Sequence, residues 1–441
     1  MDFVLAMAAF VGGVLLCLIR DLPMLYGLLL GYAGFLLMGK RRGFTLTQLM
    51  RASWEGVKES LIVVRILALI GFLTAAWRMN GTIAYCTYYG ASLVPPRLFL
   101  LAAFMLTAAI SYSIGTSLGV ASTVGVIFMG IARSGGVPEL LAAGTILSGV
   151  YFGDRTSPVS STANLVSALT GTELYANVKR MLKSSVIPVV ICCLVYGVLS
   201  WQFPLGKQNS ALLQGIALDF TLSPWLLLPV GLMLLLPVLK VNVKIAMTVS
   251  ILMAVIQTFW IQKAPVADSF FALLTGFAPQ GMQTGTLFCG GGLSSMLNVM
   301  GILMLSGTFS KIFRLTGCLK PVEDWLRKLY GSWGLFPVTA LLSLLLAMVF
   351  CSQVVATMML HTLAYEHYAE RDAQGEEMAL DLSNSVVVMA SMVPWSLSVA
   401  VPMEVMGVGA GVIPWIIFVY MLPLVYFLMK NPAFFKSKLK R

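Results

Sequence analysis

Apolar stretches separated by short polar ones run through the whole chain. A transmembrane α-helix needs about 20 apolar residues, whereas a strand of a membrane β-barrel shows about 10 residues of alternating polarity. The stretches here are continuous, so they predict an all-α polytopic membrane protein with about 11–14 hydrophobic segments. The segments lie at 3–19, 22–38, 61–79, 97–113, 117–133, 138–170, 184–203, 224–239, 243–261, 284–306, 334–350, 354–368, 379–406 and 411–429, with shorter stretches, predicted to be re-entrant, at 82–94 and 266–277.

Two of these segments are interrupted by polar residues and a proline. Segment 138–170 contains Asp154 and Pro158, and segment 379–406 contains Pro394. Lipid cannot hydrogen-bond the backbone groups that an interruption frees, so non-helical chain at membrane depth survives only where protein or water satisfies it. We therefore expect broken helices that line an ion or substrate site at both places.

The composition excludes several classes of protein. With 59% hydrophobic and 11% charged residues, the chain would expose large apolar surfaces in water, so the lipid bilayer is its expected environment. The net charge of +11 resides in clusters beside the apolar segments, which favours membrane orientation over nucleic-acid binding. We find no phosphate loop, dinucleotide fingerprint or order of residues typical of a catalytic triad, and we predict neither an enzyme nor a resident cofactor.

The basic clusters predict how the chain is oriented in a cell (inner) membrane. The first cluster follows two predicted helices, so the N-terminus should be cytoplasmic, and the parity of the segments places the later clusters and the C-terminal tail on the same side. These clusters are Lys40, Arg41, Arg42, Arg51 and Lys58; Lys179, Arg180 and Lys183; Lys311, Arg314, Lys320, Arg327 and Lys328; and Lys436, Lys438, Lys440 and Arg441.

A weak internal repeat links the two interrupted segments. Gly115 and Pro158 are 43 positions apart, and Ser352 and Pro394 are 42 apart. By parity the first unit starts inside and the second outside, so we predict two inverted repeats with a binding site where their interruptions meet. The predicted organisation is an N-terminal helix pair with a basic loop (1–60), a first repeat (61–183), connecting helices (184–283), a second repeat (284–430) and a basic tail (431–441).

Oxygen-bearing side chains gather around the interruptions. Hydroxyl, amide and carboxylate oxygens with unwound backbone carbonyls suit an alkali cation, whereas helix N-termini at the same breaks favour an anionic group. The sequence thus permits either sign of substrate. The candidate ion or substrate ligands are Thr116, Ser117, Asp154, Ser157, Ser161, Thr162 and Asn164 in the first half and Ser352, Gln353 and Ser396 in the second.

Asp154 is the strongest single candidate, as a sodium ligand. An intramembrane carboxylate costs roughly 2.5–3.5 kcal/mol on insertion scales and usually marks function. Beside Arg155 it would be placed to exchange a proton for a cation, and the competing interpretation is a structural aspartate that caps the following helix. For Arg155 the alternatives are an ion-pair partner, a contact to a substrate carboxylate, or a snorkelling side chain.

Several motifs together resemble the NhaC-type sodium/proton antiporters of the ion transporter superfamily. The resemblance covers about residues 55 to 430 and rests on Tyr151-Phe152-Gly153-Asp154-Arg155-Thr156-Ser157-Pro158-Val159-Ser160, Gly115-Thr116-Ser117, Trp77 with Gly81-Thr82-Ile83, and Pro394-Trp395. It implies exchange of cytoplasmic sodium for external protons. In some members it implies coupling of these ions to organic acids.

Two positions depart from the family pattern. Ser161 stands where the family has an aspartate, and Ser396 stands where it has an asparagine after Pro-Trp. Fewer charged and amide ligands make a small organic substrate more credible here than in a typical member.

The sequence therefore predicts a secondary active transporter, first of all a sodium/proton antiporter with Na⁺ and H⁺ as its ions. The alternative is sodium- or proton-coupled exchange or symport of a small organic acid or amino acid. An ion channel and an intramembrane enzyme are remote alternatives, and the sequence leaves the oligomeric state, homo-oligomer included, open.

Overall fold

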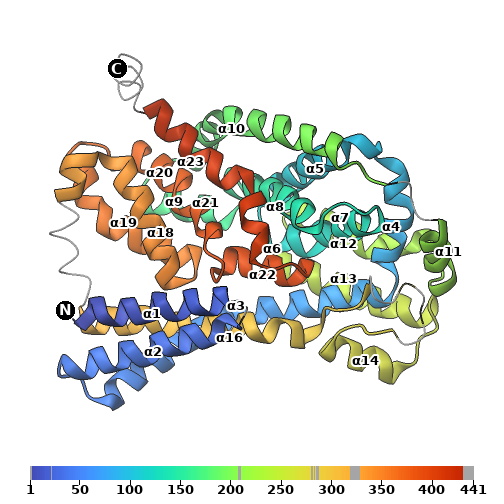
Figure 1. The fold of residues 1–441 in the computed structure, drawn as a ribbon, viewed down its shortest axis with the longest axis horizontal. Coiled ribbons are helices and arrows are strands. Elements are labelled where there is room, and N and C mark those ends of the chain that lie inside the picture. The colour runs from blue at the N-terminus through green and yellow to red at the C-terminus, as the bar shows by residue number, and fades with distance from the viewer. Residues whose placement is uncertain are drawn as a thin grey trace. The chain divides into compact units, whose positions relative to one another are not determined.

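The computed structural model describes residues 2–430 apart from 21, 207–209, 280–281, 283, 285–287 and 318–327. The basic tail 431–441 and the predicted cytoplasmic residues Lys320 and Arg327 lie outside this part of the chain. Helices make up the regular structure (Figure 1). They are α1 (Asp2–Ile19), α2 (Met24–Arg41), α3 (Leu46–Met79), α4 (Thr82–Leu93), α5 (Phe99–Ile114), α6 (Ser117–Val120), α7 (Val126–Ser134), α8 (Glu139–Thr156), α9 (Ser161–Thr170), α10 (Leu174–Gln202), α11 (Ser210–Asp219), α12 (Leu228–Val238), α13 (Val243–Trp260), α14 (Val266–Thr275), α16 (Gly292–Thr316), α18 (Leu335–Phe350), α19 (Gln353–Ala369), α20 (Glu376–Asn384), α21 (Val386–Met389), α22 (Leu397–Met406) and α23 (Ile417–Lys430).

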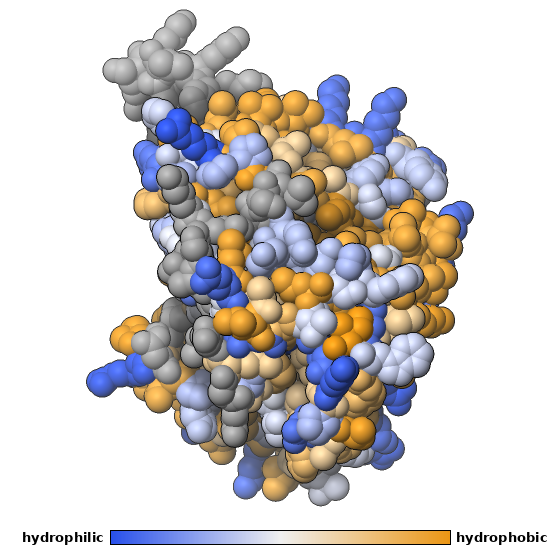
Figure 2. Space-filling view, turned by 90° about the vertical axis from the view of Figure 1, so that its right-hand side faces the viewer, coloured by the Kyte–Doolittle hydropathy of each residue, from blue (hydrophilic) through white to orange (hydrophobic). Residues whose placement is uncertain are grey.

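The helices confirm the prediction of a polytopic all-α membrane protein. Among the described residues, six helices are long and apolar enough to cross a bilayer, or up to eight if each of two bent pairs counts as one span. One bent pair, 376–392 with 397–406, is the predicted break at Pro394, and it bends by 46°. Large apolar side chains are exposed along α10. Figure 2 shows apolar patches, in orange, among polar ones on another face. Such a surface is stable in lipid and costly in water.

The chain divides into two compact units, and the division falls inside α3, α16 and α22. One unit contains residues 1–66 and 297–400, and the other contains 67–296 and 401–441. The core of the first unit is a cluster of phenylalanine rings whose centroids are 4.8–6.0 Å apart, mostly in edge-to-face arrangement. The rings belong to Phe10, Phe35, Phe309, Phe313 and Phe350. The five-part organisation predicted from the sequence stays a prediction.

Close helix packing in the second unit depends on glycine. A Cβ on Gly149 of α8 would overlap the Thr107 side chain and the Phe104 carbonyl of α5. The hydroxyl of Ser111 donates to the Val150 carbonyl at 2.7 Å. In a membrane, small residues drive helix association because they let backbones approach each other closely.

Residues 96–135 form a helical hairpin whose tip is at Gly115. Thr107 contacts Ile146 and Ser111 contacts Val150, so α5 and α8 run in the same direction. The two ends of the hairpin lie close together, because both are hydrogen-bonded to the loop that follows α10. The Leu205 N–H donates to the Pro96 carbonyl and the Gly206 N–H donates to the Gly135 carbonyl. The sequence left open whether this segment pair crosses the membrane fully or turns back. Both helices of the pair, 96–114 and 117–134, are long and apolar enough to span a bilayer, so both alternatives stay open.

A second hairpin, α18–α19, has its tip at Cys351 in the other unit. Thr339 near the start of α18 hydrogen-bonds Tyr368 near the end of α19, with 2.9 Å between the hydroxyl oxygens. Both tips have the same backbone. α5 ends at Gly115 in the left-handed conformation and extended Thr116 follows, just as α18 ends at left-handed Cys351 and extended Ser352 follows.

The two hairpins and the broken helices behind them repeat at constant spacing. The first residues of α5 and α18, Phe99 and Leu335, are 236 positions apart. The two hairpin tips are also 236 positions apart, as are the first residues of α9 and α22, Ser161 and Leu397. Pro158 and Pro394 are separated by this distance too. The predicted repeat therefore extends over matched helix boundaries with no net insertion or deletion. Its inversion across the membrane stays a prediction.

Candidate functional site

The first candidate site begins at the hairpin tip between α5 and α6. Gly115 has φ +72°, a conformation that costs other residues energy but not glycine. Thr116 caps the next helix, because its hydroxyl accepts from the Gly119 N–H at 3.3 Å. Ser117 is the first residue of that helix. The tip thus presents hydroxyl groups at the start of a helix, where the helix dipole is positive.

The break between α8 and α9 forms the other wall. α8 ends at Thr156, and the chain is extended at Ser157 before Pro158. Ser160 caps α9, with its hydroxyl accepting from the Thr162 N–H at 3.2 Å. Asn164 donates through Nδ2 to the Pro158 carbonyl at 3.2 Å and to the Ser160 carbonyl at 2.8 Å. The break therefore satisfies its own freed backbone groups, as a membrane interior requires.

The hairpin tip lies directly against this break. A Cβ on Gly115 would be 2.7 Å from the Ser160 nitrogen and 2.8 Å from the Val159 carbonyl carbon. Only glycine allows that approach, because real Cβ atoms essentially never come so close to backbone. The two polar motifs that are about forty residues apart in the sequence are thus in contact.

Asp154 lies buried in the last turn of α8, at this junction. Its side chain accepts a hydrogen bond from the Ser160 hydroxyl, with 3.1 Å between Oγ and Oδ1. Ser117, from the hairpin tip, also interacts with the carboxylate through its hydroxyl and its backbone. The Ser160 hydroxyl is 2.9 Å from that of Thr162. The arrangement collects a carboxylate and three hydroxyl oxygens from both sides of the contact.

The other predicted residues of this unit divide into two groups. Ser157 and Thr162 are buried beside the break. Ser161 and Asn164 are exposed, although both stand on the first turn of α9. Of the pair at the start of α9, it is Ser160 rather than Ser161 that contacts Asp154.

Arg155 extends from α8 toward α10. It is 1% exposed, and its guanidinium donates to the Met181 carbonyl at 3.1 Å, to the Ser184 hydroxyl at 2.9 Å and to the Ser185 hydroxyl. These three hydrogen bonds fix α10 to α8 beside the break. The guanidinium is therefore buried and hydrogen-bonded within the protein.

The second hairpin tip meets its own broken helix in the other unit. The Leu397 N–H at the start of α22 donates to the Cys351 carbonyl at 2.8 Å. The indole of Trp395 donates to the Met348 carbonyl at 2.7 Å. Tip and break are therefore joined here as well, by hydrogen bonds in place of the glycine contact.

The second-half candidates surround this junction. Gln353 donates through Nε2 to the Val387 carbonyl, and its Oε1 accepts from the Ser398 hydroxyl at 3.3 Å. Ser352 precedes Gln353 at the tip. Ser396 is fully buried, and its hydroxyl has no partner in the described structure. Its counterpart in the repeat is Ser160, while the counterpart of Asp154 is Ala390, so this junction lacks the carboxylate.

Ser160, the partner of Asp154, is one of the oxygen-bearing side chains that the sequence places around the first break, although it is not among the ligands singled out there. Sequence reasoning left out a second buried group, Asp381 in α20, which is fully buried and accepts from the Tyr368 hydroxyl at 2.7 Å. An acidic residue inside the interrupted segment 379–406 was the available signal.

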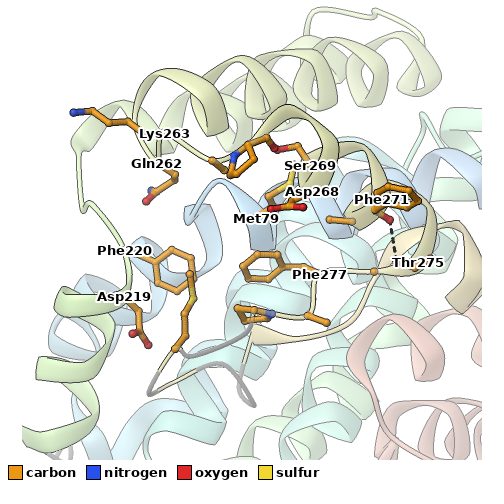
Figure 3. A pocket seen from close by; sticks show the side chains of 17 residues that line it. Met79, Asp219, Phe220, Gln262, Lys263, Asp268, Ser269, Phe271, Thr275 and Phe277 are labelled. Carbon is orange, nitrogen blue, oxygen red and sulfur yellow. Dashed lines mark hydrogen bonds between the residues drawn. The ribbon is translucent and has the colours of Figure 1, made fainter.

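One cavity of about 630 Å³ lies beside α11 and α14 (Figure 3). Asp268 and Phe277 lie close together in it, while Lys263 points away. Asp219 at its edge accepts from the N–H and hydroxyl of Thr284. Its lining contains none of the residues predicted from the sequence, so this cavity is separate from the site around Asp154.

Comparison with known proteins agrees with this architecture. Residues 149–430 match the model of the Na⁺/H⁺ antiporter family, so the chain belongs to that family. It is therefore a multi-pass membrane protein and a secondary antiporter.

Three relatives of this chain are named for different solutes. The chain is 27% identical to the malate-2H⁺/Na⁺-lactate antiporter of Bacillus subtilis (strain 168) over 388 residues, which cover 85% of this chain and 82% of the relative. It is 26% identical to the Na⁺/H⁺ antiporter NhaC of Alkalihalophilus pseudofirmus over 379 residues, 84% of this chain and 81% of the relative. It is 29% identical to the arginine/ornithine antiporter ArcD of Halobacterium salinarum over 407 residues, 88% of this chain and 81% of the relative.

Proposed function

We propose that this antiporter exchanges sodium ions for protons and that Asp154 is the carboxylate for which the two ions compete. The observation that carries the proposal is the buried Asp154 side chain at the contact between the hairpin tip and the break after α8, with the Ser160 hydroxyl on its Oδ1. Carboxylate, hydroxyl and carbonyl oxygens are the ligands that hard cations prefer. A single carboxylate that binds either ion couples the two fluxes.

The remaining ligands are proposed from the same junction and from its counterpart. Ser117, Ser157 and Thr162 supply hydroxyls near Asp154, and Thr116 sets the start of α6. Asn164 holds the break in shape, and Arg155 holds α8 against α10. From the second half we propose Ser352, Gln353 and Ser396, of which Ser396 has a buried hydroxyl without a partner in the described structure.

The proposed setting is the cell membrane, with both termini in the cytoplasm. This orientation follows from the basic clusters at Lys40 to Lys58 and Lys179 to Lys183, which favour the cytoplasmic side. No resident cofactor is needed for exchange of this kind, since the two ions themselves are the coupled species.

Asp154→Asn tests the proposal because it keeps the shape of the side chain and removes its titratable charge. We expect sodium-driven proton flux in proteoliposomes to fall to the level of empty liposomes, while the protein remains folded and monodisperse. Asp372→Asn is the matched control, because Asp372 is an exposed loop residue with φ +53° and asparagine tolerates that conformation. Normal flux in Asp154→Asn would refute the assignment.

A second candidate function, exchange of a small organic acid or amino acid coupled to sodium or protons, is favoured by the malate/lactate and arginine/ornithine relatives. The two functions separate in one experiment. Sodium-driven proton flux without any organic solute supports the first, and flux that requires an added organic acid or amino acid supports the second.

A further inference from the structure

Arg78 is a buried arginine whose hydrogen-bonding capacity is largely unused. It lies in the last turn of α3 and is 6% exposed. Its Nη1 group has no hydrogen-bond partner in the described structure, and its Nη2 group reaches the Val405 carbonyl only at 3.5 Å. A buried charged group without hydrogen bonds costs far more than a paired one, so such a guanidinium is kept where something else satisfies it.

Trp77 and Asn80, on either side of Arg78 at the end of α3, are both hydrogen-bonded to α13. The indole of Trp77 donates to the Ser250 hydroxyl at 3.0 Å, and the Asn80 amide donates to Gln257 Oε1 at 3.0 Å. Both partners belong to α13. Arg78 lies away from these contacts, between the Val405 carbonyl at the end of α22 and the backbone of Gly290.

The positive charge of Arg78 has no carboxylate against it in the described structure. The groups that act on it electrostatically are Arg133, which has the same sign, and the thiol of Cys289, which acts in the opposite direction. Arg133 has its own partners, Glu139 at 2.8 Å and the Met406 carbonyl at 2.7 Å. The guanidinium groups of Arg78 and Arg133 thus lie in the same region, and the Glu139 carboxylate there is already paired with Arg133.

A run of glycines lies along α3, and its first member, Gly290, is beside the guanidinium. Gly290, Gly291 and Gly292 have φ of +114°, +75° and +83°, and the run passes from Arg78 to Thr74 as far as the first residue of α16. The position of a Cβ on Gly290 is 3.9 Å from the Arg78 Cζ. Backbone without side chains, leading into the positive end of a 25-residue helix, is a setting in which proteins hold anions.

We infer that Arg78, with the glycine run before α16, is a binding site for the carboxylate group of a small organic anion. A guanidinium presents parallel N–H groups that match a planar carboxylate in two-point contact. The site has the opposite sign to the proposed cation site at Asp154 and does not depend on it. Occupied, it would supply the hydrogen bonds and the negative charge that Arg78 lacks.

The test measures thermal unfolding of the purified full-length protein in detergent, followed by the fluorescence of its nine tryptophans. Sodium acetate, sodium lactate and sodium glutamate are compared with sodium chloride and sodium phosphate at equal sodium concentration and ionic strength. A ligand that binds the folded state raises the midpoint in a concentration-dependent way. We expect a higher midpoint in at least one carboxylate salt than in chloride and phosphate.

Arg78→Gln should weaken this carboxylate binding by about tenfold or more, the range expected when a hydrogen bond to a charged group is lost. Arg314→Gln is the matched control. Arg314 is the counterpart of Arg78 in the repeat, also three residues before a glycine with positive φ, but it is exposed. Its variant should bind carboxylates as the wild type does. Should Arg78→Gln not fold, Arg78→Lys, which keeps the charge and loses the planar fork, is expected to show the weaker binding.

Three results would overturn the inference. They are equal wild-type midpoints in carboxylates and chloride, an equal or larger effect of phosphate, and carboxylate binding that survives removal of the Arg78 guanidinium. Asp154→Asn separates the two proposals, because it should retain the carboxylate effect even though its ion exchange is lost.

Discussion

The hydroxyl of Ser160 donates to Oδ1 of Asp154 at 3.1 Å, across the break that separates α8 from α9. The same hydroxyl accepts from the Thr162 N–H and so caps α9. Ser160 therefore connects the Asp154 carboxylate to the start of α9. A change in the position of the carboxylate should alter the cap of α9, and a change at the cap should alter the carboxylate.

Ser160→Ala should weaken sodium binding more than it destabilises the fold. A hydrogen bond to a charged group contributes about 1.5–3 kcal/mol, so we expect the apparent sodium affinity to fall by about tenfold or more. Loss of the cap costs about 1 kcal/mol of stability. Sodium dependence of proton flux and the unfolding midpoint measure the two effects, with Ser134→Ala, a buried serine on α7 that bonds only its own helix backbone, as control.

Ser161→Asp distinguishes the two proposed solutes. On the first turn of α9, close to the Asp154 junction, an added carboxylate should tighten sodium binding a few-fold and increase sodium/proton exchange. If the transported solute carries its own carboxylate, the variant should repel it and slow its uptake. Ala168→Asp adds the same charge at an exposed position near the other end of α9. No response to Ser161→Asp in either assay would place position 161 outside the site.

Gly149→Val should separate α5 from α8. The new side chain would overlap the Phe104 carbonyl and the Thr107 side chain, and overpacking of this kind costs about 1–3 kcal/mol. We expect a lower unfolding midpoint and reduced transport. Gly197→Val, toward the C-terminal end of α10 where nothing lies within 4 Å of the new Cβ, carries the same change in helix propensity without the overlap. Equal midpoints for the two variants would contradict the packing role of Gly149.

Topology can be checked with single cysteines in a cysteine-free background. A cysteine at Lys179, exposed on α10, should resist impermeant thiol reagents in intact cells, because the basic cluster 179–183 is predicted to be cytoplasmic. A cysteine at Val266, 71% exposed at the start of α14, should react, since the segment before the second repeat is predicted to be outside. The reverse labelling pattern would invert the proposed orientation.

Much of the fold could be predicted because lipid imposes a simple pattern. The apolar runs gave the helices, and Pro158 and Pro394 marked breaks that the structure contains. Which helices pack against the two hairpins could not be predicted, because apolar composition does not say which helices contact each other. The packing is set by contacts between distant residues, such as Ser111 with Val150.

The candidate site was proposed from its polar residues, and the structure adds which of them contact Asp154. The helical period did not decide whether Ser160 or Ser161 contacts Asp154, because Ser160 is the N-cap and precedes the first residue of α9. Arg155 was open to three interpretations, and its contacts to Ser184 and Ser185 depend on how α10 packs. Arg78 was not singled out, because its burial arises from Gly290 and Val405, far away in sequence.

Because the spacing is 236 positions at the hairpin tips and at the breaks, a residue at these places in the first half has its counterpart 236 positions later in the second half. Ala390 occupies the place of Asp154, and Ser396 the place of Ser160. The halves therefore differ in the side chains at these positions, and they differ also in the helix before the break, because α8 is continuous whereas its counterpart is divided at Ser385 into α20 and α21. A carboxylate could be moved from one half to the other by exchanging two side chains, with no change in the length of any loop.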